Sequence, residues 1–205
     1  MNRDTRLETI AGPAGAIACA VDAPAQAPIG VAVLCHPHPQ HGGTMDNKVV
    51  QTVARAALAL GYLAVRFNFR GVAGSAGAWD EGRGEVDDAL AVAAHFRLDA
   101  LPLALAGFSF GGYVAARAAA ALADAGIAAD RLVLVAPATS RFGVGEVAAN
   151  TLVVHGEADD VVPLSATLDW ARPQNLPVLV LPGVGHFFHG QLGLLKAVLT
   201  RSWHP

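Results

Sequence analysis

Short runs of apolar residues alternate with amphipathic stretches along most of the chain. Each run is continuously apolar over a few residues, which is typical of strands that are covered on both faces of a sheet. The predicted strands are 16–21, 29–35, 62–69, 102–107, 132–136, 151–155 and 177–181. Strands that alternate with helical patterns indicate repeated strand–helix–strand units and a mostly parallel sheet.

The stretches between the apolar runs carry apolar residues at the spacing of a helix face. The first such stretch follows Asp46, which we expect to cap it, and stops before Gly61, a residue suited to the position after a helix. The predicted helices are 47–60, 83–97, 111–125, 164–171 and 189–201. The interval 137–150 between two predicted strands is short and leaves no room for an inserted domain. We therefore expect one α/β domain over 1–205, with helices on both faces of the sheet and no cap domain.

Composition narrows the function classes. Hydrophobic residues make up 53% of the 205 residues and charged residues 15%, which is enough apolar material for a buried core. The formal net charge of −3 gives no basic surface for nucleic acid, and no apolar run is long enough to span a bilayer. The polar N-terminus lacks the apolar segment of a secretory signal, and Cys19 and Cys35 show no CxxC spacing. We expect two buried free thiols in a cytoplasmic protein, monomeric or homodimeric.

The pentapeptide Gly107-Phe108-Ser109-Phe110-Gly111 matches the G-x-S-x-G pattern of a nucleophile elbow. It follows an apolar strand and precedes a helix, which is the setting that this motif requires. A tight turn crowds the positions two before and two after the serine, so both need to lack a Cβ atom. The sequence therefore predicts Ser109 as a nucleophile.

A serine nucleophile needs a base, and the base needs a carboxylate that holds its tautomer. On this type of sheet the expected chain order is serine, then acid, then histidine, each after the end of a strand. The strand 151–155 leads to Asp159 and Asp160, and the strand 177–181 leads to His186. We expect His186 to be the base and one of the two aspartates to be the acid.

Other residues near these positions have competing interpretations. Glu157 is a weaker candidate for the acid, and the aspartate that is not the acid would belong to a solvated turn. His189 competes with His186 as base but is better placed to start the last helix. His155 lies at the end of a strand, where a structural hydrogen-bonding role is favoured.

Three histidines lie close together in the loop 36–44. In this loop Pro37 and Pro39 have no N–H group, so the amide of His38, with Gln40 as the alternative, is expected to join the amide of Phe110 in an oxyanion hole. We expect neither a metal nor a cofactor, because no carboxylate or cysteine with ligand spacing joins the histidines. The imidazoles are instead expected to shape the loop.

Five segments together resemble the small lidless α/β-hydrolases of bacteria, which are related to the dienelactone-hydrolase group and to short-chain carboxylesterases. They are HPHPQHGGTMDNKVV, RFNFRGVAGSAG, GFSFGG, HGEADDVVP and GHFFHG. The similarity extends from about Gly30 to the last predicted helix. It implies the α/β-hydrolase fold and a catalytic triad of Ser109, Asp159 and His186, the acid being the residue four past the histidine of HGEADDVVP. Dienelactone hydrolases carry cysteine as nucleophile, so the serine here argues against that substrate.

The resulting hypothesis is a serine hydrolase that cleaves small carboxylic esters through an acyl-enzyme. We expect Trp79 and Phe187 to wall the substrate pocket and the partner to be a small-molecule ester. Arg70 could bind a substrate carboxylate, but a role in holding the following loop is favoured. The alternatives are a thioesterase or amidase with the same triad, and a non-catalytic interaction protein on a hydrolase scaffold.

Overall fold

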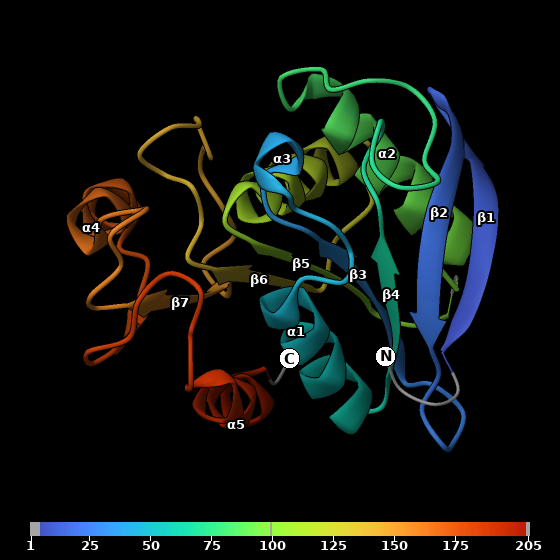
Figure 1. The fold of residues 1–205 in the computed structure, drawn as a ribbon. Helices are drawn as coiled ribbons and strands as arrows, with labels where there is room; N and C mark the ends of the chain where they lie inside the picture. The colour runs from blue at the N-terminus through green and yellow to red at the C-terminus, as the bar shows by residue number, and fades with distance from the viewer. Residues whose placement is uncertain (1–4, 99, 204–205) are drawn as a thin grey trace.

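The computed structural model describes residues 5–98 and 100–203, and within them eight strands form one sheet (Figure 1). The strands are β1 (Arg6–Gly12), β2 (Gly15–Asp22), β3 (Gly30–Cys35), β4 (Tyr62–Phe67), β5 (Leu103–Phe108), β6 (Arg131–Val135), β7 (Leu152–Gly156) and β8 (Val178–Leu181). Across the sheet the order is β1-β2-β4-β3-β5-β6-β7-β8. β2 pairs antiparallel with both of its neighbours, and every pair from β4 across to β8 is parallel. The predicted mostly parallel sheet is confirmed.

The sequence pattern predicts seven of these strands and misses β1. This edge strand pairs only with β2, in the register that aligns Arg6 with Val21 and Gly12 with Gly15. Most of its side chains are exposed or half-exposed, with Ile10 as its buried residue. A strand that buries so little has no apolar run, so hydrophobic patterning does not reveal it.

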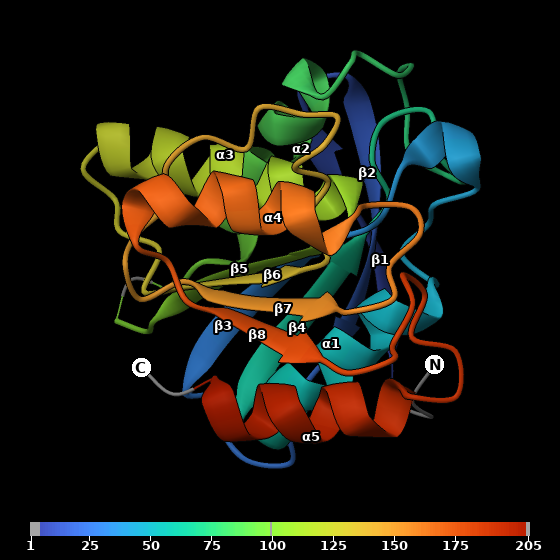
Figure 2. The same cartoon turned by 90° about the vertical axis from the view of Figure 1, so that its left-hand side faces the viewer.

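In the described residues, five α-helices cover the two faces of the sheet (Figure 2). α1 (Lys48–Ala59) and α5 (Leu192–Ser202) pack on one face. α2 (Arg83–Phe96), α3 (Phe110–Asp124) and α4 (Leu164–Ala171) lie on the other. The helices on both faces are therefore as predicted, and each begins within three residues of its expected start.

The cap of α1 differs from the prediction. Asn47, and not Asp46, caps the helix: its side-chain oxygen accepts hydrogen bonds from the amides of Val49 at 2.9 Å and Val50 at 3.4 Å. Asp46 instead forms an ion pair with Arg66 at 3.3 Å. Asparagine and aspartate cap equally well, so sequence alone does not separate neighbouring candidates.

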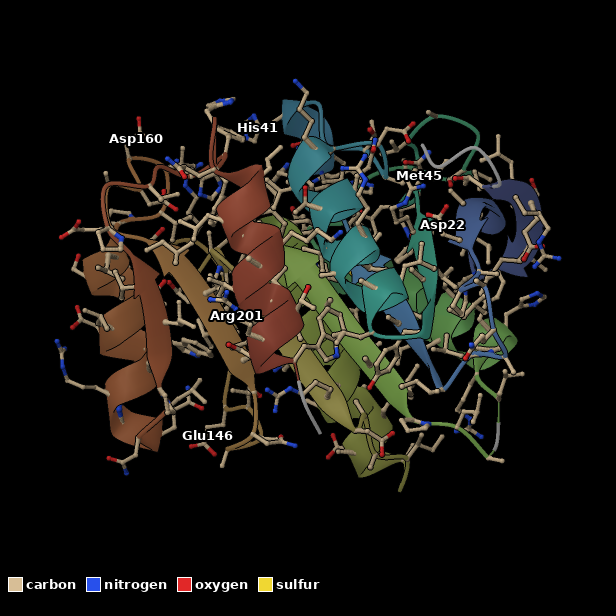
Figure 3. All side chains as sticks on the ribbon, turned by 90° about the horizontal axis from the view of Figure 1, so that it is seen from below. Asp22, His41, Met45, Glu146, Asp160 and Arg201 are labelled. Atoms are coloured by element: carbon tan, nitrogen blue, oxygen red, sulfur yellow. The ribbon has the colours of Figure 1, made fainter. Side chains whose placement is uncertain are left out.

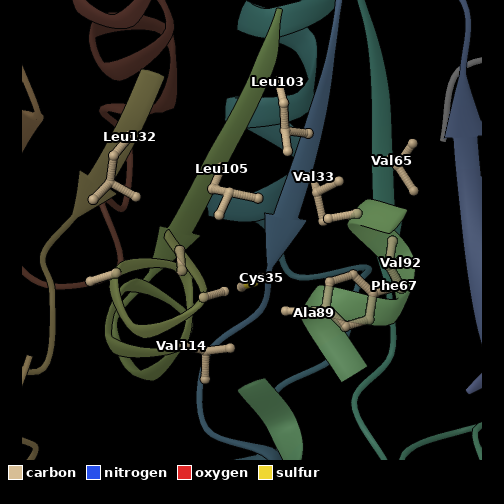
Figure 4. Close-up of a cluster of buried hydrophobic side chains, with 14 of the residues drawn as sticks. Val33, Cys35, Val65, Phe67, Ala89, Val92, Leu103, Leu105, Val114 and Leu132 are labelled. Carbon is tan, nitrogen blue, oxygen red and sulfur yellow. The ribbon is translucent and has the colours of Figure 1, made fainter. Parts of the chain in front are cut away.

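Apolar side chains fill the space between the sheet and each helix layer. Figure 4 shows one such cluster, in which Val33 and Phe67 of the sheet meet Ala89 and Val92 of α2 and Val114 of α3. The described helices include none long and apolar enough to traverse a bilayer.

Both cysteines lie on strands of the sheet. Cys19 on β2 and Cys35 on β3 are buried free thiols, as predicted. Burial raises the pKa of Cys19 to about 12, with a further contribution from the charge of Glu8, and burial also raises the pKa of Cys35. Both therefore stay protonated at neutral pH.

Candidate active site

Ser109 occupies a sharp turn between β5 and α3. Its backbone has φ 55° and ψ −118°, a conformation that costs free energy for any residue with a side chain. Three hydrogen bonds hold the turn: the Ser109 amide donates to Val135 at 3.0 Å, and the Ser109 carbonyl accepts from Gly112 at 2.9 Å and Ala138 at 3.1 Å. The strain is thus balanced by bonds to the two neighbouring segments.

The two glycines of the pentapeptide are required by close backbone contacts. A Cβ atom on Gly107 would lie 2.0 Å from the carbonyl oxygen of Gly111. A Cβ atom on Gly111 would lie 2.2 Å from the carbonyl oxygen of Cys35. The first oxygen belongs to α3 and the second to the end of β3, and both are backbone atoms that cannot shift as a side chain can, so the structure supports the steric reason for glycine at both positions.

The loops after β7 and β8 bring Asp159 and His186 to Ser109. His186 Nε2 lies 3.0 Å from Ser109 Oγ, and His186 Nδ1 lies 2.7 Å from Asp159 Oδ2. A carboxylate accepts, so Nδ1 carries the proton and Nε2 is left to accept from the serine hydroxyl. All three residues are buried. The arrangement can move a proton from Ser109 to His186.

Asp159 is held as an ionised carboxylate. Burial raises its pKa, but hydrogen bonds from His186 and from the amides of Val162 and Val161 together outweigh burial and leave the pKa below its ordinary value. The amides donate to Oδ1 at 2.7 Å from Val162 and 2.9 Å from Val161. These bonds leave Oδ2 directed at His186.

The competing acids lie away from the histidine. Asp160 is exposed and stands at the outer margin of the molecule (Figure 3). Glu157 accepts a hydrogen bond from the amide of Gly183 at 2.9 Å, which fixes the turn after β8. Of the three carboxylates considered, Asp159 is the one that contacts His186.

The other histidines near these loops make structural contacts. The exposed His189 ring lies 5.7 Å from the Phe187 ring. His155 is buried: its Nε2 donates to the Val162 carbonyl at 2.9 Å, and Thr167 donates to its Nδ1 at 3.2 Å. His155 has the structural hydrogen-bonding role that the sequence favours.

In the histidine-rich loop, His36 ties two strands together. The amide of Phe69, after β4, donates to His36 Nε2 at 3.1 Å, and His36 Nδ1 lies 2.6 Å from the Pro37 carbonyl. His38 instead packs its ring against those of His41 and Trp79, each at 4.6 Å. Among the described residues, no cluster of three or more histidines, cysteines or acids is arranged to hold a metal ion.

A cavity of about 310 Å³ opens beside Ser109. Its lining is mostly apolar and comes from the loops at the carboxyl edge of the sheet: Pro37, His38, His41, Gly42, Gly43, Asn47, Ser109, Phe110, Ala138, Arg141, Phe142, Val161, Val162, His186 and Phe187. Phe187 is among these residues. Trp79 is not among them; its ring packs 4.6 Å from the ring of His38 and 5.1 Å from that of Phe110, two residues that do line the cavity.

The segment between β6 and β7 supplies the part of the wall that sequence reasoning missed. Arg141 and Phe142 belong to it and line the cavity, and Phe142 packs its ring 5.1 Å from that of Phe110. The feature of the sequence that could have indicated this segment is its position. It starts at the carboxyl end of β6, next to the turn that carries Ser109.

The backbone amides of Phe110 and His38 are the two that the sequence analysis expects to form an oxyanion hole. Phe110 begins α3, so its N–H has no acceptor one helical turn back. Within the described parts of the chain, no hydrogen bond engages the amide of Phe110 or that of His38. Both residues line the cavity together with Ser109.

Arg70 does not reach the cavity. Its guanidinium binds both carboxylate oxygens of Asp88 on α2, at 2.8 and 3.0 Å, and its amide donates to the same side chain at 2.9 Å. Arg70 therefore anchors the segment after β4 to α2, in line with the favoured structural role.

Two solved structures that are similar along the whole chain are described as α/β serine hydrolases. XC6422 of Xanthomonas campestris, described as an α/β serine hydrolase without a lid, is 39% identical with a TM-score of 0.91 over 100% of this chain and 97% of that one. An α/β serine hydrolase homologue of Coxiella burnetii is 38% identical with a TM-score of 0.87, over 100% and 99% of the two chains.

Two further comparisons cover parts of the chain. The uncharacterized protein RP471 of Rickettsia prowazekii is 42% identical over 88 residues, which span 42% of this chain and only 37% of that protein. A family model described as a thioesterase domain matches residues 85–156. From the full-length similarity and the shared architecture it follows that this chain belongs to the lidless α/β serine hydrolases, with the α/β-hydrolase fold.

Proposed function

We propose that this protein hydrolyses small carboxylic esters, with Ser109 as nucleophile, His186 as base and Asp159 as the acid that orients it. The observation that carries the proposal is the continuous line of hydrogen bonds from Asp159 through His186 to Ser109, at 2.7 and 3.0 Å, which ends at a cavity. A serine on a strained turn with a base in contact is the arrangement that nucleophilic acyl transfer needs.

In the first half of the reaction, Ser109 Oγ attacks the ester carbonyl carbon while its proton passes to His186 Nε2. The carbonyl electron pair moves to oxygen and forms a tetrahedral oxyanion. When this intermediate collapses, the C–O bond to the alcohol breaks and His186 returns the proton to the leaving oxygen. The products are the alcohol and an acyl ester of Ser109.

In the second half, water replaces the alcohol. His186 Nε2 takes a proton from water as the water oxygen attacks the acyl carbon. Collapse of the second tetrahedral intermediate breaks the bond to Ser109 Oγ, which receives the proton from His186. The acid leaves and the enzyme is restored.

The amides of Phe110 and His38 are the proposed donors to the oxyanion. Both are free of other acceptors in the described residues, and Phe110 lies at the N-terminus of α3, where the helix dipole favours negative charge. Such preorganised donors act on charge that exists only in the transition state.

Thioester hydrolysis is the second candidate. The thioesterase-domain match over residues 85–156 includes Ser109 and favours it, and the triad chemistry is the same for both acyl bonds. Comparing kcat/KM on an oxyester and a thioester of the same acyl group separates the two.

A fluorophosphonate probe and one pair of variants test the proposal. We expect the probe to label the wild type and the control Ser165→Ala, whose serine is exposed on α4. Ser109→Ala should remain folded, escape labelling and lose esterase activity by roughly 10⁴-fold. Activity near that of the wild type in Ser109→Ala, or a wild type that neither reacts with the probe nor cleaves any ester, would contradict the proposal; the second result would favour a non-catalytic scaffold.

A further inference from the structure

The charge of the active-site cavity differs in sign from that of the whole protein. The chain has a formal net charge of −3. No aspartate or glutamate is among the residues that line the cavity, whereas Arg141 is, together with three histidines. The carboxylate of Asp159 is not among the lining residues and is hydrogen-bonded to His186 Nδ1. A ligand in this cavity therefore meets one permanent positive charge and no facing carboxylate.

Arg141 is the arginine among the residues that line the cavity. Several other arginines of the described residues are engaged by acids: Arg66 pairs with Asp22, Arg70 with Asp88 and Arg172 with Asp169. Within the described residues, Arg141 has neither an ion pair nor a side-chain hydrogen bond. Arg141 is exposed and lines the cavity, so its guanidinium is available to a ligand.

The surroundings of Arg141 show that its charge acts on the cavity. The pKa of His38 is lowered by burial and then by the positive charges of His41 and Arg141. Asp160, the exposed carboxylate on the loop before Val161, stands at the outer margin of the molecule and does not line the cavity (Figure 3). The positive charge of Arg141 is therefore not cancelled where a substrate would lie.

We propose that Arg141 binds a carboxylate of the substrate, so that the preferred substrates are esters that carry a second, ionised carboxyl group. This inference rests on the proposed function. The planar guanidinium offers paired N–H donors that match the two oxygens of a carboxylate. The apolar walls supplied by Phe142, Val162 and Phe187 would cover the carbon skeleton between the carboxylate and the ester.

A second cation lies near the site but in a less favourable setting. Lys48 lines a neighbouring cleft of about 460 Å³ that shares Gly42, Asn47 and Phe187 with the active-site cavity. The same cleft is also lined by Asp46, so a ligand carboxylate there would face a carboxylate of the protein as well as Lys48. Arg141 has no such neighbour on its wall, so we assign carboxylate binding to Arg141.

Two matched substrate pairs test the assignment and locate the carboxylate. The first pair is the 4-nitrophenyl monoester of adipic acid and 4-nitrophenyl hexanoate, which differ by a carboxylate at the end of the acyl chain. The second pair is 4-butyryloxybenzoate and 4-butyryloxybenzamide, which differ by a carboxylate on the leaving group. For each enzyme variant, kcat/KM for the charged ester is divided by kcat/KM for the neutral ester of the same pair. The two esters differ in chemical reactivity, but this difference is the same for every variant and cancels when the ratios are compared.

For Arg141→Gln we expect the ratio to fall by about 10-fold in at least one pair. Arg141→Lys should retain part of the preference, since lysine keeps the charge but not the paired donors. The control Arg201→Gln, an exposed arginine on α5 (Figure 3), removes the same charge and should leave both ratios unchanged. High salt should weaken the preference in the wild type.

An unchanged ratio in both pairs for Arg141→Gln would overturn the inference, as would an equal fall in Arg201→Gln. A fall in Lys48→Gln but not in Arg141→Gln would place the carboxylate in the neighbouring cleft and also overturn it. Failure of the proposed function looks different: the wild type would cleave none of the four esters and would not react with a fluorophosphonate.

Discussion

At the scale of single residues, Asp159 and Asp160 show how neighbours of the same type acquire different environments. Asp159 is buried and accepts hydrogen bonds from His186 and two amides. Asp160 is exposed, and no interaction ties it to His186. One side chain is therefore buried and its neighbour exposed, which sequence spacing alone does not reveal.

Replacing each aspartate by asparagine separates the two environments. We expect Asp159→Asn to lower kcat by roughly 10⁴-fold, because an amide no longer enforces the tautomer with the proton on His186 Nδ1. Asp160→Asn serves as the matched control and should change kcat less than about threefold. Steady-state kinetics on 4-nitrophenyl butyrate give both values, and the reverse ranking would assign the acid to Asp160.

At this scale the sequence indicates candidate residues where chemistry restricts the residue type. Ser109, Asp159 and His186 are recognisable because their order and their places after strands are set by the reaction. Trp79 and Arg141 are not restricted in this way, and the structure places the arginine at the cavity and packs the tryptophan against two residues that line it. The position of a wall residue depends on how a loop folds back, and this depends on tertiary packing.

At the scale of elements, a buried histidine joins the ends of β3 and β4. His36 Nε2 accepts the hydrogen bond of the Phe69 amide, so it must be unprotonated in the folded state. Burial lowers the pKa of His36 to about 4, and a weaker opposing effect comes from the bond to Pro37. Burial lowers the pKa of His155 as well.

This arrangement predicts acid destabilisation. Above the ordinary value of 6.5, His36 is neutral whether folded or unfolded and its effect on stability is constant. As the pH falls from 6.5 toward 4, the unfolded chain binds a proton that the folded protein excludes, so the free energy of unfolding decreases, by on the order of 3 kcal/mol for His36 alone. Urea titrations at several pH values measure this slope.

The variant His36→Gln provides the comparison. It is expected to be less stable than the wild type at pH 7 but to lose less stability between pH 6.5 and 4, with the remaining slope due to His155 and other groups. Equal slopes for the wild type and His36→Gln would contradict the assignment of the acid sensitivity to His36.

The elements themselves were largely foreseeable. Buried strands such as β3 and β5 are apolar along their whole length, so their sequence marks them. The edge strand β1 is set by pairing with β2, and the cap of α1 by a choice between adjacent residues. The edge strand and the helix cap both depend on local geometry, which the pattern of apolar and polar residues does not indicate.

At the scale of the whole molecule, a cavity of about 310 Å³ limits the size of the acyl group. The segment between β6 and β7 contributes Arg141 and Phe142 to the wall, and Phe187 is 45% exposed at the mouth. A short acyl chain can be covered by this wall, whereas a long chain must extend into water.

We therefore expect kcat/KM for 4-nitrophenyl esters to be high for acetate and butyrate and to fall for chains of about eight carbons or more. Each buried methylene adds up to about 0.8 kcal/mol of binding, and this gain stops where burial stops. Rates measured over the acyl series from acetate to palmitate check the expectation. A rate that keeps rising to palmitate would show an acyl tunnel and contradict it.

The two buried thiols have a practical consequence for following the protein in solution. Cys19 and Cys35 are protonated and shielded by the sheet, so a thiol-specific dye can react with them only after the strands separate. The rate of dye incorporation into the native protein thus reports how often the centre of the molecule opens. A cysteine introduced at an exposed position would react far faster and serve as a single attachment point for a fluorophore.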